Sequence, residues 1–116
     1  MRPVKPAFVL IAMLAASPLA VSPAMALDAP ADVLAAGRAI LSKNCARCHA
    51  IDKEGESPLA KAPAFRTLGQ RYAIDTLGEG LAEGLVTAHE DMPEIVFEPD
   101  QIDQILAYLQ SIQVEK

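Results

Sequence analysis

The sequence predicts a small all-α domain with a helix near each end and a loop-rich middle. Apolar residues recur at helical spacing in three stretches, and no run of useful length alternates as a strand would. The chain has 116 residues, which allows one domain at most. A domain of this size buries a modest core and often depends on a disulfide, a metal or a cofactor.

The N-terminal segment reads as a secretory signal. A basic start, the apolar run AFVLIAMLAA and the small-residue triplet AMA at 24–26 follow one another in the order of such signals. The apolar run is about half the ~20 residues that a membrane-spanning helix needs, and Ser17-Pro18 interrupts it, so a retained anchor is the weaker alternative. We expect residues 1–26 to be removed and residues 27–116 to form the mature domain in the periplasm.

The first predicted helix runs from Ala31 to about Asn44, with Pro30 suited to its first turn. A loop follows between Ala50 and Ala64, where Gly, Ser, Pro and charged residues are mixed. The second helix is expected between Ile74 and about Val86, although three glycines weaken it.

The last helix has the clearest pattern. Pro99 suits its first turn, and Asp100 complements the positive end of the helix dipole. Its apolar residues form one stripe at helical spacing. They are Ile102, Ile105, Leu106, Leu109 and Ile112.

Acidic residues outnumber basic ones, and unevenly. The chain has 10 Lys and Arg against 15 Asp and Glu, a formal net charge of −5 at pH 7. Residues 27–72 carry seven basic and five acidic residues, whereas 73–116 carry one basic and ten acidic. Nucleic acid is therefore not an expected partner, because phosphate binding needs clusters of Lys and Arg.

The only two cysteines, Cys45 and Cys48, are followed directly by His49 in NCARCHA. Two thiols at this spacing can add to the vinyl groups of one haem, and the adjacent histidine then faces the iron, as in c-type haem attachment. A redox disulfide is an alternative, but that motif belongs beside a βαβ pattern, which is absent. A zinc site is another, since Cys45, Cys48, His49 and His89 suffice by count. The spacing favours one covalently bound haem c per chain.

Met92 is the only methionine of the predicted mature chain. It lies in the polar stretch HEDMPEI, an unusual place for a core methionine, and Pro93 stiffens the backbone beside it. His89 competes for the sixth position of the iron, where a second imidazole would lower the reduction potential and a methionine raises it. We expect His49 and Met92 to be the axial ligands, and His89 to be a surface or loop-bracing residue.

With CxxCH at 45–49 and Met-Pro at 92–93, the chain resembles the class I c-type cytochromes, specifically the short bacterial periplasmic monohaem type. The likeness implies a fold of about three to five helices around one haem, with the N- and C-terminal helices crossing. In that family a glycine of the first helix packs against an aromatic residue of the last. Gly37 and Tyr108 occupy the matching places, and Ile40 or Leu41 with Ile105 would complete the crossing.

The resemblance also implies groups around the haem. Pro63 in KAPAFRTL matches a proline whose carbonyl accepts the proton on the outer nitrogen of the ligand histidine, which would fix the tautomer of His49. Arg66 and Tyr72 in FRTLGQRY resemble residues that pair with the haem propionates. The chain has no Trp, so the propionate contact that an indole makes in the mitochondrial branch is replaced or absent.

The function that follows is one-electron transfer by a monomeric carrier that is not an enzyme. Its expected partners are redox proteins: a dehydrogenase or the quinol-oxidising complex on one side, and a terminal oxidase or reductase on the other. Two alternatives stay open. One is a dedicated cytochrome subunit that accepts electrons within an oxidoreductase complex, and the other is a haem enzyme or gas sensor with a labile sixth ligand.

Overall fold

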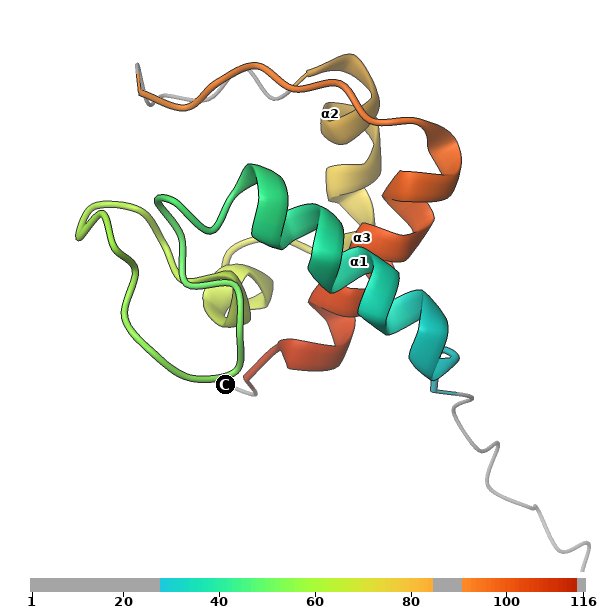
Figure 1. The fold of residues 1–116 in the computed structure, drawn as a ribbon, viewed down its shortest axis with the longest axis horizontal. Coiled ribbons are helices and arrows are strands. Elements are labelled where there is room, and N and C mark those ends of the chain that lie inside the picture. The colour runs from blue at the N-terminus through green and yellow to red at the C-terminus, as the bar shows by residue number, and fades with distance from the viewer. Residues whose placement is uncertain (1–27, 85–90, 115–116) are drawn as a thin grey trace, which may run out of the picture.

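The structure, a computed structural model, describes residues 28–84 and 91–114 (Figure 1). Within these ranges it has three α-helices, two short 3-10 helices and no strand, which confirms the all-α fold class. In chain order they are α1 (Ala31–Asn44), η1 (Phe65–Gln70), η2 (Ile74–Thr76), α2 (Leu77–Glu83) and α3 (Pro99–Ile112). The predicted signal peptide, the expected end of the second helix at Val86 and the competing ligand His89 lie outside the described residues.

No helix within residues 28–84 and 91–114 is long and apolar enough to span a lipid bilayer.

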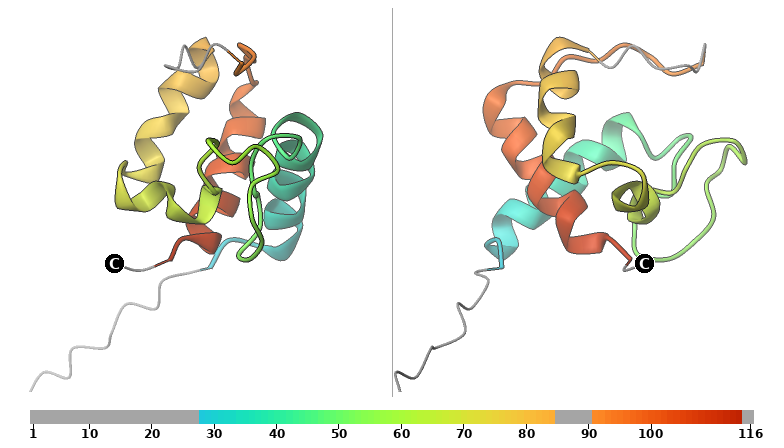
Figure 2. Two further views of the ribbon diagram at one scale, coloured as in Figure 1. Left: turned by 90° about the vertical axis from the view of Figure 1, so that its left-hand side faces the viewer. Right: turned by 180° about the vertical axis from the view of Figure 1, so that it is seen from behind.

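Helices α1 and α3 cross at Gly37, near the middle of the molecule (Figures 1 and 2). A Cβ atom built on Gly37 would lie 2.1 Å from the backbone oxygen of Gln104 and 2.9 Å from the Cβ of Tyr108. Because atoms cannot approach so closely, the crossing requires a residue without a side chain here. The expected pairing of Gly37 with Tyr108 is therefore present in the structure.

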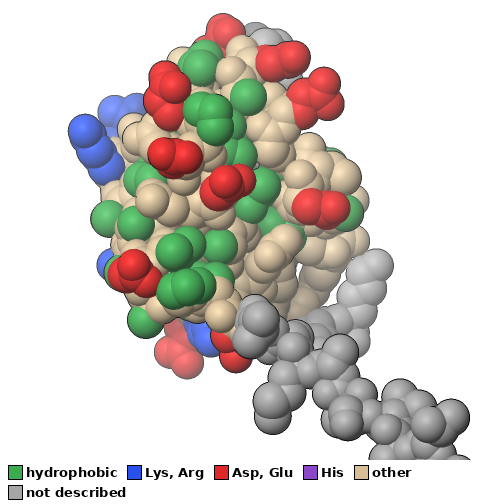
Figure 3. All heavy atoms as spheres, turned by 90° about the vertical axis from the view of Figure 1, so that its right-hand side faces the viewer, with side chains coloured by type: hydrophobic (Ala, Val, Ile, Leu, Met, Phe, Trp, Pro, Cys, Tyr) green, Lys and Arg blue, Asp and Glu red, His purple; other side chains and the backbone are tan. Residues whose placement is uncertain are grey.

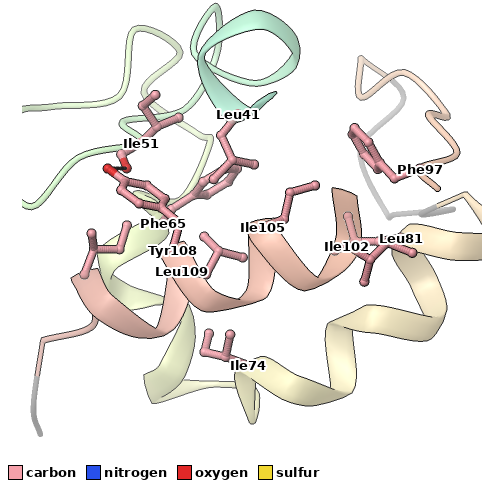
Figure 4. Packing of buried hydrophobic residues seen from close by; sticks show 11 residues of the cluster. Leu41, Ile51, Phe65, Ile74, Leu81, Phe97, Ile102, Ile105, Tyr108 and Leu109 are labelled. Atoms are coloured by element: carbon pink, nitrogen blue, oxygen red, sulfur yellow. Dashed lines mark hydrogen bonds between the residues drawn. The ribbon is translucent and has the colours of Figure 1, made fainter. Parts of the chain in front are cut away.

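Helix α3 supplies much of the core. Its N-terminus is capped by a hydrogen bond from the Glu98 amide to Oε1 of Gln101, at 3.1 Å. Ile105 is fully buried and belongs to one apolar cluster to which α1, both 3-10 helices and α2 also contribute side chains (Figure 4). The other buried residues of the predicted stripe are Ile102, Leu109 and Ile112.

The second helix is shorter than the sequence predicts. A 3-10 turn, η2, precedes α2, which ends at Glu83 because Gly84 has a φ of 91°, in the left-handed region that glycine adopts readily. The 3-10 helix η1 was not expected, and it buries Phe65 against the core.

A polar network ties the segment after His49 to both crossing helices. Arg38 of α1 donates to the Asp52 carboxylate from Nε at 2.8 Å and from Nη2 at 2.9 Å. The hydroxyl of Tyr108 in α3 lies 2.9 Å from Oδ1 of Asp52 and 3.2 Å from the carbonyl oxygen of Ile51. The hydrogen bonds from Arg38 and Tyr108 lower the pKa of Asp52. Burial and the contact with Asp52 raise the pKa of Tyr108 to about 12.

We expect Gly37→Ala to lower the free energy of unfolding by about 1–3 kcal/mol or more, as overpacking does, because the added methyl group would overlap the Gln104 carbonyl. Urea denaturation of the haem-bound protein measures the change. Gly78→Ala in α2 is the matched control. A Cβ there would meet Cδ1 of Leu106 at 3.4 Å, an ordinary contact, and removing a glycine from such a site stabilises by about 0.4–1 kcal/mol. Equal midpoints for Gly37→Ala and the wild type would contradict the close crossing.

A second prediction concerns alkaline pH. Since the pKa of Tyr108 rises from 10.0 to about 12 on folding, its contribution to stability is complete below pH 10 and is lost as the pH approaches 12. At about pH 8 the wild type should be more stable than Tyr108→Phe by about 1 kcal/mol, the usual contribution of one hydrogen bond. This difference should shrink between pH 10 and 12. Urea midpoints of both proteins across that range measure it, and a constant difference would refute the assignment.

Candidate functional site

A cavity of about 600 Å³ opens between the C-terminal end of α1, η1, α2, α3 and the segment that begins at Asp91. Its volume lies in the range of about 300–1,000 Å³ that is usual for ligand and cofactor sites. The walls are mainly core side chains. They include Leu41, Phe65, Leu68, Leu77, Leu81, Ile95, Phe97, Ile105 and Leu109.

The CxxCH motif lies at one edge of this cavity. After α1, the chain continues in a hydrogen-bonded turn, with the Cys48 and His49 amides donating to the carbonyl oxygen of Cys45 at 3.1 and 3.0 Å. The turn brings all three side chains to the cavity wall. The two cysteines are not joined by a disulfide. Burial raises the pKa of the Cys45 thiol to about 11, so the thiol is protonated at neutral pH until it is modified.

His49 is oriented by a backbone group. Its Nδ1 lies 2.7 Å from the carbonyl oxygen of Pro63. Because a carbonyl oxygen only accepts hydrogen bonds, Nδ1 carries the proton, and Nε2 keeps the lone pair that a metal needs. The ring of Phe65 packs beside the imidazole, with the two ring centroids 4.7 Å apart.

Met92 lines the same cavity as Cys45, Cys48 and His49. Its segment is anchored further along at Phe97, which is buried and whose amide donates to the carbonyl oxygen of Leu81 at 3.0 Å. The structure thus brings together residues that are 43 positions apart in the sequence, from His49 to Met92.

The two residues expected at the haem propionates lie in different places. Tyr72 lines the cavity and is 53% exposed. Arg66 is not among the described residues that line it, and its Nη1 donates instead to the carbonyl oxygen of Gly55 at 2.7 Å. Both propionate roles stay predictions.

Basic residues that the sequence reasoning did not single out also line the cavity: Lys43, Arg47 and Lys61. Arg47 has a signal in the sequence, because it is inside the CxxCH motif itself. Lys61 has no such signal in the sequence. It lies outside the motif, and only the fold brings it to the cavity wall.

The donor set at the cavity wall fits haem. An apolar cavity with two thiols and one oriented imidazole at its wall suits a flat apolar macrocycle. Bound there, haem supplies a reversible one-electron change at iron.

Comparison with known proteins agrees with this fit. The family model described as Cytochrome c matches residues 34–113, which is more than half of the chain. Neither the curated proteins nor the solved structures gave a match. Members of the matched family hold haem c covalently and use it for electron transfer, and the cysteines at 45 and 48 have the required spacing. The chain, an all-α protein with the haem-attachment motif at the wall of an apolar cavity, belongs to the cytochrome c family.

Proposed function

We propose that the protein is a periplasmic one-electron carrier whose haem is attached through Cys45 and Cys48 and ligated axially by His49 and Met92. The observation that carries the proposal is the convergence of these four residues on one cavity. The carrier is a monomer and has no catalytic residues of its own.

The contact between His49 and Pro63 supports the proximal half of this assignment. A hydrogen bond from Nδ1 to a backbone carbonyl fixes the ring orientation and makes Nε2 a better electron donor to iron. Phe65 limits rotation of the ring from the side. His49 would therefore keep the same geometry in both oxidation states, which suits a carrier.

The surroundings of the haem favour a high reduction potential. Apolar walls disfavour the additional positive charge of ferric haem, and a thioether ligand acts in the same direction. The many carboxylates of the chain oppose this. One carboxylate about 15 Å from iron contributes only about 0.3 kcal/mol in water, so the axial ligand should dominate.

The uneven surface charge supports an encounter with other redox proteins. The cavity is lined by three basic residues, Lys43, Arg47 and Lys61, and one carboxylate, Asp91. By contrast, Asp and Glu side chains spread over the face shown in Figure 3, with Lys and Arg only near its edges. Such a separation orients an approaching partner and accelerates association at low salt. The partners we propose are a dehydrogenase or quinol-oxidising complex as donor and a terminal oxidase or reductase as acceptor.

The test is Met92→Ala in the haem-bound protein. We expect the weak red-end sulfur-to-ferric absorption band to disappear, the ferrous protein to bind carbon monoxide much faster than the wild type does, and the reduction potential to fall. The fall should be large, because axial ligation shifts haem potentials over a span of about 0.8 V.

Ile95→Ala is the matched control for this test, because Ile95 lines the same cavity and has no atom that could ligate iron. It should keep the band and bind carbon monoxide about as slowly as the wild type. Rapid carbon monoxide binding by the ferrous wild-type protein would refute the carrier assignment and favour an enzyme or gas sensor with a labile ligand.

A further inference from the structure

An ion pair joins the two sides of the cavity. Nζ of Lys61 lies 2.6 Å from Oδ2 of Asp91. Lys61 is two residues before Pro63, whose carbonyl oxygen contacts His49, and Asp91 directly precedes Met92. The pair therefore links the segment that orients one proposed ligand to the segment that carries the other.

The Lys61 end of this link is well anchored. The turn that carries Lys61 is hydrogen-bonded to the haem-attachment motif, with the Leu59 amide donating to the Cys48 carbonyl oxygen at 3.1 Å. The Ala62 amide closes the turn by donating to the carbonyl oxygen of Leu59 at 2.8 Å. Lys61 thus projects from a turn fixed to the motif itself.

The Asp91 end of the link lies directly beside Met92 in the chain. The backbone hydrogen bond from Phe97 to Leu81 anchors this segment five residues beyond Met92. Figures 1 and 2 show the segment from Asp91 onward projecting from the helices on the same side as the loop that contains Lys61. The attraction between Lys61 and Asp91 acts on the residue directly before Met92 and so restrains the backbone that carries the thioether.

We propose that Lys61 and Asp91 are positioning residues that hold Met92 at the iron, so that their ion pair controls how readily the sixth position opens to an external ligand. This inference rests on the proposed ligation by Met92. Both side chains are largely exposed, 57% for Lys61 and 66% for Asp91. Exposed pairs shift an equilibrium only modestly, by up to roughly fivefold, and salt weakens them. The pair would thus adjust ligand exchange without determining whether the protein folds.

The experiment measures the rate at which carbon monoxide binds to the ferrous haem-bound protein. Carbon monoxide is uncharged, so a change of surface charge does not alter its approach. Lys61→Gln and Asp91→Asn should each accelerate binding roughly two- to fivefold, because either substitution breaks the pair. The charge-swapped double variant, Lys61→Asp with Asp91→Lys, should return the rate toward the wild-type value.

The reduction potential separates positioning from simple charge effects. Lys61→Gln removes a positive charge near the haem and should lower the potential, whereas Asp91→Asn removes a negative charge and should raise it. A pure charge effect thus moves the two variants in opposite directions. Loss of positioning accelerates ligand binding in both.

The dependence of the carbon monoxide binding rate on ionic strength tests the ion pair of Lys61 and Asp91 independently. Raising the ionic strength should accelerate carbon monoxide binding to the wild type toward the rate of Lys61→Gln, and should leave that variant nearly unchanged. Lys43→Gln is the matched control. Lys43 lines the same cavity, and no ion pair joins it to any other described residue.

Equal rates in the wild type and Lys61→Gln, or an equal acceleration in Lys43→Gln, would overturn the inference. The sulfur-to-ferric band of the wild type tells this failure from a failure of the proposed ligation. If the band is present but the rates do not respond, only the positioning role is wrong. If the band is missing, the ligation by Met92 is wrong as well.

Discussion

The contact on which the rest of the structure depends is the crossing of α1 over α3 at Gly37. At this point the backbone of one helix touches the backbone of the other, with space for a hydrogen atom but not for a methyl group. The close approach lets Leu41 and Ile105 pack directly against each other's helix, so both become almost completely buried. The crossing also holds the C-terminal end of α1 in place relative to α3, and the haem-attachment motif begins at that end with Cys45.

Several hydrogen bonds extend this constraint from the helices to the motif. Tyr108, one helical turn beyond Gln104, reaches the backbone at Ile51 and the carboxylate of Asp52, three residues after His49. The loop then returns, and the carbonyl oxygen of Pro63 meets the imidazole of His49. The loop is therefore held at its start by both crossing helices and at its end by the haem-attachment motif. These contacts together orient the imidazole of His49.

What the sequence could predict depends on whether the information is local. The bounds of α1 and the start of α3 follow from proline positions and apolar spacing, and the structure confirms them. The end of α2 does not follow, because any of three glycines could have broken the helix and only the backbone angle at Gly84 decides. Contacts between distant residues were also missed, such as that of Lys61 with Asp91, since each residue alone resembles solvated surface. The contact of Arg66 with the carbonyl oxygen of Gly55 was missed for the same reason, and the propionate role that the family pattern suggested for Arg66 stays a prediction.

The residues that wall the cavity are largely the residues that form the core. Leu41, Phe65, Ile105 and Leu109 belong to both, so a haem bound in the cavity would complete the packing of the same side chains that hold α1 against α3. A chain this small has no second core on which to rely. Binding of a group by the folded state alone stabilises that state, and here the covalent thioether bonds would make the gain permanent. The fold and the redox site are for this reason one structural unit, and a substitution in the wall should change stability and reduction potential together. Lys61 and Asp91 also line the cavity but are largely exposed, so substitutions of this pair should change the reduction potential and the proposed hold on Met92 with little effect on the core.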